Sequence, residues 1–233
     1  MALAARVSAL RGQIAPVAAI SIFGLSISMS YPLLNLLLER MGASGFAIGV
    51  NTVAAAVSMV IFAPILPRIM ARTGAGALLV GSGVAMAVLF LLFPLMPDYT
   101  AWLLLRLVYG FCGTAVFFAS EYWIVTTAPQ ERRGRVIALY AISLSVAFML
   151  GPLIIRATGI DGMLPFAVGA GVLLLGTLPV VWGLSALPAA APEAPPTPAA
   201  TLKFFVTDPV VVWGVVLFGA IEYGTVALLP VWA

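Results

Sequence analysis

Seven long apolar runs constrain this chain more than any other feature of its sequence. They cover approximately residues 14–38, 46–67, 75–96, 101–123, 136–155, 163–187 and 209–232. A helix of about 20 residues crosses the ~30 Å hydrocarbon layer of a bilayer, because each residue rises about 1.5 Å. With 63% hydrophobic and 8% charged residues, the chain carries more apolar side chain than one soluble core can hide. The sequence therefore predicts an all-α integral membrane protein.

The runs are divided six plus one by a segment rich in proline and alanine, LSALPAAAPEAPPTPAATLKFF. Such a composition offers no periodic apolar face and is typical of a semi-extended linker. We expect a six-helix transmembrane bundle over 1–187, a linker over 188–208, and a seventh transmembrane helix over 209–233 that begins an incomplete second bundle. The chain is then either a fragment of a longer protein or an unusual short form.

Two similar segments hint at an internal repeat. APILPRIMARTG at 63–74 resembles GPLIIRATG at 151–159 when a gap is allowed, and each lies between two apolar runs. The segments fall on opposite sides of the membrane, as in inverted-topology repeats of three helices each. Chance similarity between helix ends is the alternative.

Several classes of function are disfavoured by composition. The chain has no histidine, which excludes histidine-based triads and ordinary zinc sites. The single Cys112 lies inside an apolar run and allows no intrachain disulfide. No phosphate-binding loop of the G-x-x-x-x-G-K-[ST] type is present. We expect no enzymatic activity, no cofactor, no metal site and no nucleic-acid partner.

Basic residues lie mostly in alternate loops, and this bias predicts orientation. With the N-terminus in the cytoplasm, two basic residues outside the spans face outward, Arg40 and Arg156. The other eight are then cytoplasmic: Arg6, Arg11, Arg68, Arg72, Arg132, Arg133, Arg135 and Lys203.

Small or polar residues within the first run follow a helical stripe. These are Ser21, Gly24, Ser28, Tyr31 and Asn35, spaced so that all five share one face. Small and polar residues let helices pack closely and bond across the contact. The alternative is the wall of a polar cavity, which the larger Tyr31 and Asn35 favour.

Two charges, Arg106 and Glu222, lie deep within the spans, where a charge is costly unless it finds a partner or water. Arg106 lies about five residues inside the fourth run and either extends to the interface or serves a polar site. Glu222 lies about 13 residues into the seventh run, at a depth of ~20 Å that is similar to that of Arg106. A pair or a proton-linked switch between them is one hypothesis, and a glutamate satisfied by backbone or water is the other.

Three motifs resemble the N-terminal part of a major facilitator superfamily transporter. RIMARTG, from Arg68 to Gly74, occupies the loop where that superfamily has G-x-x-x-D-R-x-G-R-R, although the acidic position falls on Ala71. RLVYGFCG, from Arg106 onward, is similar to the R-x-x-x-G motif of the fourth helix. EYW at 121–123, followed by ERRGRVIALY at 131–140, resembles the end of that helix and the next loop in a bacterial branch.

This resemblance implies a secondary active transporter of a small molecule, working by alternating access in a bacterial cytoplasmic membrane and coupled to protons. The residues that it and the polar pattern favour for the cavity or for proton coupling are Ser28, Tyr31, Asn35, Arg106, Tyr109 and Glu222. Those favoured for a cytoplasmic gate of ion pairs are Arg68, Arg72, Gly74, Glu121, Arg132, Arg133 and Arg135. For Arg132, Arg133 and Arg135, which lie in the loop between the fourth and fifth runs, the competing explanation is that they only fix the orientation of the helices in the membrane.

Two alternatives belong to other functional classes. A seven-helix receptor or retinal protein fits the number of runs, but Lys203, the only lysine, lies in the linker and not in a helix. A truncated protein that does not transport, or that regulates a full-length relative, also fits, and a complete chain of this length would need to form a homodimer to transport. The sequence does not select a substrate.

Overall fold

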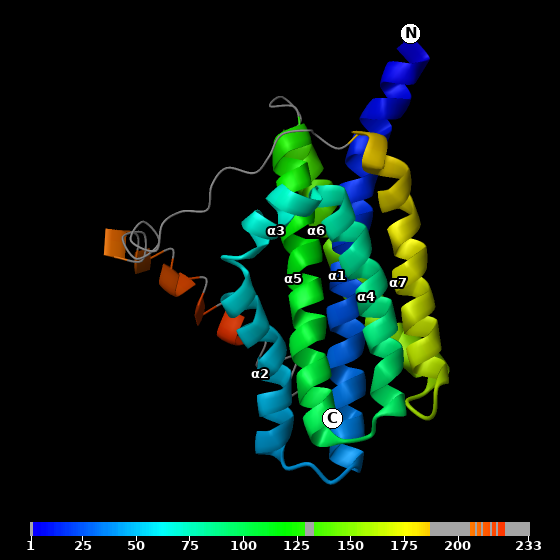
Figure 1. Cartoon of the computed structure of the whole chain (residues 1–233), viewed down its shortest axis with the longest axis vertical. Helices are drawn as coiled ribbons and strands as arrows, with labels where there is room; N and C mark the ends of the chain where they lie inside the picture. Colours follow the sequence, from blue (N-terminus) through cyan, green and yellow to red (C-terminus); the bar gives the residue numbers. More distant parts are fainter. Residues whose placement is uncertain are drawn as a thin grey trace.

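The computed structural model of the chain is a bundle of long helices (Figure 1). It describes residues 2–128 and 133–186, together with 206–207, 209–210, 212–214, 216–217 and 219–221, and for 2–11, 13, 133 and 186 it describes the backbone only. Within these ranges every regular element is an α-helix or a short 3-10 helix. The all-α prediction is confirmed.

Six helices are long and apolar enough to span a membrane, and they match the first six predicted runs. They are α1 (Ala2–Arg40), α2 (Gly45–Phe62), α4 (Ala75–Leu92), α5 (Tyr99–Thr127), α6 (Arg133–Thr158) and α7 (Leu164–Gly183). In α1 the apolar part is Ile14–Arg40, and the 3-10 helix η1 (Phe93–Leu95) extends the span of α4. A second 3-10 helix, η3 (Leu184–Ala186), follows α7.

The prediction for the second run was wrong at its end. The run to residue 67 is not one helix, because α2 ends at Phe62 and a turn over 63–65 contains Pro64, which lacks a backbone N–H. The predicted loop that follows is instead a short helix, α3 (Leu66–Thr73). Gly74 ends α3 with φ of +82°, a conformation that side chains with a Cβ rarely adopt, and its N–H donates to the Met70 carbonyl.

Helix packing follows the two-repeat pattern that the sequence predicts. The most extensive contacts of α1 are with α5, α6 and α7, those of α5 are with α1, α2 and α4, and α4 also packs on α7. Exchanging α1 with α5, α2 with α6 and α4 with α7 leaves this set unchanged. Such symmetry is expected when helices α1, α2, α4 and helices α5, α6, α7 form two related triplets.

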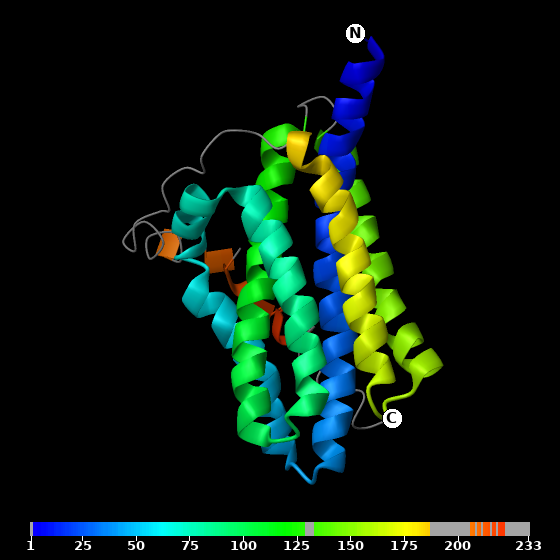
Figure 2. The same cartoon turned by 45° about the vertical axis from the view of Figure 1, so that its right-hand side comes forward.

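Helices α1 and α5 form the centre of the bundle, and small residues allow neighbouring helices to approach them closely (Figures 1 and 2). A Cβ on Gly110 of α5 would lie 2.8 Å from the Cα of Ala55 in α2. A Cβ on Gly151 of α6 would lie 2.2 Å from Ser28 Oγ in α1. By contrast, only 17% of the most apolar 18-residue stretch of α6 is buried, whereas 67% of the corresponding stretch of α1 is buried.

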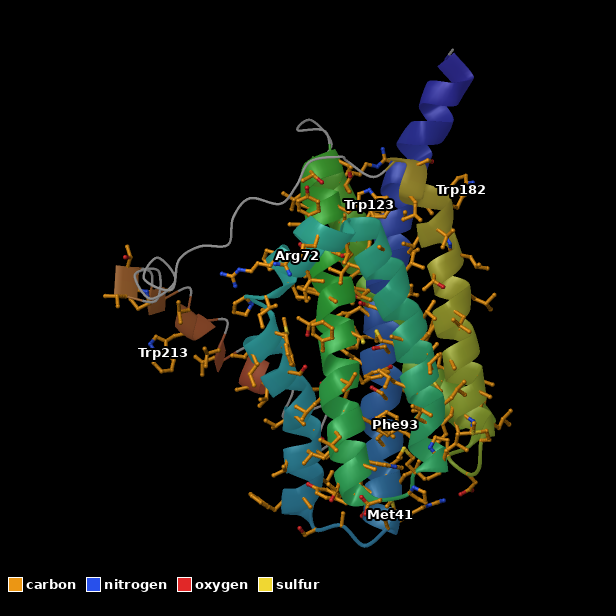
Figure 3. All side chains as sticks on the ribbon, in the orientation of Figure 1. Met41, Arg72, Phe93, Trp123, Trp182 and Trp213 are labelled. Atoms are coloured by element: carbon orange, nitrogen blue, oxygen red, sulfur yellow. The ribbon has the colours of Figure 1, made fainter. Side chains whose placement is uncertain are left out.

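The two ends of the bundle differ in what they carry (Figure 3). One end carries the N-terminus, α3 and the first turns of α6, and Arg72 and Trp123 lie toward it. We call this the N-terminal end. The opposite end carries the loops around Met41, Phe93 and residues 159–163.

The predicted linker lies largely outside the described residues. The described parts of 206–221 are helical, and Val210 and Trp213 are among their exposed apolar side chains. A separate seventh transmembrane helix over 209–233 stays a prediction.

Candidate functional site

Arg106 lies in the centre of the bundle and is fully buried, with 0% of its surface exposed. It comes from α5, and its Nη1 donates to the backbone carbonyl of Ser30 in α1 at 3.4 Å. Its guanidinium carbon lies 4.6 Å from the centroid of the Tyr31 ring, which is a cation–π contact. The structure therefore excludes the alternative in which the side chain extends to the surface of the bundle.

The other edge of this guanidinium is open. Nε and Nη2 of Arg106 have no hydrogen-bond partner in the described part of the chain. None of the buried charged or polar side chains described is an aspartate or a glutamate. A buried cation without an anion is costly in a low-dielectric interior, so this edge is an unusual feature.

Tyr109 lies one turn beyond Arg106 on the same helix and is also buried, with 4% exposed. Its hydroxyl faces Ser26 and Ser30 but forms no hydrogen bond of normal geometry. Its ring centroid lies 6.0 Å from that of Phe90 and 6.3 Å from that of Phe93, so aromatic side chains fix the ring. The polar edge of Tyr109 thus lies between α1 and α5 without a firm partner.

A second polar group joins α1 to α2. The Thr52 hydroxyl donates to Asn35 Oδ1 at 3.0 Å, and Asn35 Nδ2 has no partner among the described residues. Asn51 is fully buried, and neither of its amide atoms has a partner within the same ranges.

Asn51 lies at the depth of Arg106. Helices α2 and α5 run in the same direction, because the Tyr99 hydroxyl donates to the Ala47 carbonyl at 2.9 Å and Gly110 touches Ala55 further along. Residue 51, midway between 47 and 55, therefore lies level with the part of α5 between Tyr99 and Gly110, which contains Arg106.

A small cavity of about 30 Å³ lies beside Tyr31 and Tyr109, and its wall does not include Arg106 or Asn51. Helices α1, α2 and α5 line it, and its wall includes Ser26, Tyr31, Tyr109, Gly110 and Thr114. The missing side chain of Gly113 also leaves space, since a Cβ there would meet its nearest neighbour, Phe23, only at 3.7 Å. This conformation has room for a functional group rather than for a whole solute.

Ser28 lies elsewhere in the bundle. Its hydroxyl donates to the carbonyl of Ala147 in α6 at 3.1 Å and to that of Leu25 at 3.2 Å. Gly24, on the same stripe, packs against Leu144 and Ala147 of α6. The stripe therefore splits, because its first part packs on α6 while Tyr31 and Asn35 meet Arg106 and Thr52.

The proposed gate residues lie at the N-terminal end. Arg68, Arg72 and Gly74 are exposed in and after α3, and Arg135 is exposed on α6. Glu121 is half-buried, and the Tyr140 hydroxyl faces it. The one ion pair formed between described residues is Arg40 with Asp161 at the opposite end.

Three predicted residues cannot be placed. Glu222 and Arg132 lie outside the described residues, and of Arg133 only the backbone is described. Among the described residues no group of three histidine, cysteine, aspartate or glutamate side chains could hold a metal ion.

Sequence reasoning missed Ser30 and Asn51. Both are polar residues inside apolar runs, so the rule that singled out Asn35 would have found Asn51 as well. Ser30 lies outside the predicted stripe of the first run. It matters because its backbone carbonyl accepts a hydrogen bond from Arg106, and no pattern of side chains reveals such a contact.

Comparison with known proteins identifies the family. The profile of the Major Facilitator Superfamily matches residues 17–233. The chain belongs to this superfamily, and its apolar helices make it an integral membrane protein. It is similar to the uncharacterized MFS-type transporter YfkF of Bacillus subtilis (strain 168), with 24% identity over 174 residues that cover 75% of this chain and 44% of the relative. The chain thus spans less than half the length of the curated relative it matches. Membership of this family points to transport rather than catalysis.

Proposed function

We propose that this chain is the N-terminal bundle of a secondary active transporter that moves a small molecule by alternating access and is coupled to protons. The observation that carries the proposal is the fully buried Arg106 with an open guanidinium edge. Ionisable residues inside membrane proteins are expensive, and they mark substrate or ion pathways. The family membership supports transport in general terms.

The packing supports alternating access. Close contacts at Gly110 join α5 to α2, and those at Gly151 join α6 to α1. Because α1 also packs on α5, these four helices form one packed body. In transporters built from repeats, such bodies rock against one another around a fixed site near the midplane. The layer of Arg106, Tyr109, Asn35 and Asn51 is the part of this bundle that fits such a site.

Coupling to protons requires a group that changes charge during the cycle. Glu222 is the candidate, because burial favours a neutral carboxyl whereas an arginine partner favours the charged form. If Glu222 pairs with Arg106 in one conformation of the transporter and separates from it in the other, the carboxyl group of Glu222 is charged in the first and binds a proton in the second. The same cycle needs a cytoplasmic gate, for which the proposed residues are Arg68, Arg72, Gly74, Glu121, Arg132, Arg133 and Arg135. We place the protein in a bacterial cytoplasmic membrane with its N-terminus on the cytoplasmic side.

The test uses the whole gene product that contains this chain, reconstituted in liposomes with a pH-sensitive dye inside. Labelled sugars, amino acids, amines and carboxylates are offered with and without an imposed proton gradient. We expect one class to accumulate only with the gradient and not after addition of a protonophore. Arg106→Gln should abolish the uptake, and Arg40→Gln, at the exposed ion pair, should not. Uptake with unchanged pH dependence in Glu222→Gln would overturn the role of Glu222.

A further inference from the structure

The open edge of Arg106 has a defined geometry. In a guanidinium group the N–H of Nε and one N–H of Nη2 point in the same direction, and this edge matches the two oxygens of a carboxylate. Nη1, on the other side, is already bonded to the Ser30 carbonyl. The two atoms without a partner in the described residues are thus the pair that forms a two-donor edge.

This edge is held in place before any ligand arrives. The guanidinium carbon lies over the Tyr31 ring, 4.6 Å from its centroid, and Nη1 donates to the Ser30 carbonyl at 3.4 Å. A donor group that is already oriented loses less freedom on binding, which favours affinity and selectivity.

The surrounding unpartnered atoms are mostly donors as well. Among the described residues, the hydroxyls of Ser30 and Tyr109 and the amide nitrogens of Asn35 and Asn51 lack partners, and so does one pure acceptor, Asn51 Oδ1. The hydroxyls can donate as well as accept. An ammonium ligand would be repelled by the positive charge of Arg106. The layer is therefore suited to an anion and unsuited to a cation.

We propose that the Nε/Nη2 edge of Arg106, with Tyr31, Ser30 and Tyr109 around it, is a binding site for one carboxylate group. The group belongs either to the transported molecule or to the chain itself, where Glu222 is the candidate. The cavity of about 30 Å³ that Tyr31 and Tyr109 line has the scale of such a group and not of a large solute, and Arg106 itself is not part of its wall. The identification of this site as a substrate site rests on the transport function proposed above. The proposal that it binds a carboxylate does not depend on transport.

Thermal unfolding of the purified whole protein in detergent tests this site without a known substrate. Benzoate and acetate serve as probes, benzamide and acetamide are their uncharged counterparts, and ionic strength is held constant. We expect the two carboxylates to raise Tm by about 2–4 °C at ~5 times the dissociation constant, and the amides to leave it unchanged.

Two variants at Arg106 separate geometry from charge. Arg106→Lys keeps the positive charge but loses the two-donor edge, so the half-saturating carboxylate concentration should rise at least ~10-fold. Arg106→Gln should remove the response altogether. Arg40→Gln is the matched control, because Arg40 is an exposed arginine at the end of the bundle and should leave the response intact.

Glu222→Gln identifies the source of the carboxylate. An equal response in the wild type and in Glu222→Gln supports a site for a free anion. A response seen in Glu222→Gln but not in the wild type supports a site occupied by the chain's own carboxylate. Arg106→Lys is therefore compared in whichever background responds, the wild type or Glu222→Gln. The proposal is overturned if neither background distinguishes carboxylate from amide, or if adding Arg106→Lys leaves the response of the responding background unchanged.

The outcome is separable from that of the transport experiment. Carboxylate binding without uptake of any solute in liposomes would refute the proposed transport and leave the site standing. Proton-driven uptake of an uncharged solute, unaffected by Arg106→Lys, would refute the carboxylate site and leave transport standing.

Discussion

Arg106 and the arginines at the N-terminal end of the bundle show two different uses of the same residue type. Arg106 is fully buried, and two contacts from α1 fix its orientation. Arg68, Arg72 and Arg135 are exposed, and none of them forms an ion pair with another described residue. A buried charge must be compensated by polar groups around it. An exposed charge is solvated by water, and its position follows from the positive-inside rule. The difference predicts that substitutions in the interior have large, specific effects and those at the end small ones.

The largest effect is expected where the interior helices approach each other. In Gly110→Leu the new side chain would start 2.8 Å from the Ala55 Cα and 2.9 Å from its carbonyl oxygen, so α2 must move away from α5. We expect destabilisation of about 3 kcal/mol or more, with little folded protein recovered. Gly134→Leu is the control, since a Cβ there meets nothing within 4 Å, and its Tm should be unchanged or slightly higher. A stable Gly110→Leu protein would show that the α2–α5 contact is looser than described.

The second prediction is a substitution that stabilises the protein rather than destabilising it. Without a bound anion the open edge of Arg106 is a buried charge that lacks compensation, so Arg106→Met should stabilise the unliganded protein by about 1–4 kcal/mol. Thermal unfolding with and without benzoate measures this, and the advantage of the variant should shrink as benzoate stabilises the wild type. Arg135→Met, at an exposed position, should change stability by less than about 0.5 kcal/mol. A less stable Arg106→Met protein would mean that Arg106 already has an anionic partner.

The first six transmembrane helices were predictable because the length of an apolar run reflects the thickness of the bilayer, whereas the short helix α3 was not predicted. The end of the second run was not predicted, because Pro64 lies among apolar residues and composition alone does not reveal the break at Phe62. The depth of Arg106 indicated a polar site, and that prediction included Tyr31 and Asn35. The direction of each side chain was not predictable, because Ser28 and Tyr31 share one stripe and yet meet different helices. The open guanidinium edge depends on a backbone carbonyl of Ser30, and no residue pattern encodes it.

The third prediction concerns the ring that positions Arg106. Tyr31→Leu removes the aromatic face that lies 4.6 Å from the guanidinium carbon, so the charge loses its cation–π contact and its fixed plane. We expect benzoate to bind about 3- to 30-fold more weakly, which corresponds to the range of cation–π energies. Tyr31→Phe keeps the ring and should bind nearly as the wild type does. Equal loss in both variants would assign the effect to the hydroxyl instead.

The smallest effect is expected at the surface. Arg68 and Arg72 lie one turn apart on α3, and both are exposed, so the double variant Arg68→Gln/Arg72→Gln loses no described ion pair. We expect a stability change below about 0.5 kcal/mol and unaltered benzoate binding, because exposed charges are well solvated. Calorimetry of the purified protein and the benzoate titration check both points. A large fall in Tm would show that these arginines contact charged groups, and the contrast between interior and surface arginines would then need another explanation. Unchanged binding together with unchanged stability would leave orientation in the membrane as their main role, as the predicted cytoplasmic position of eight basic residues suggests.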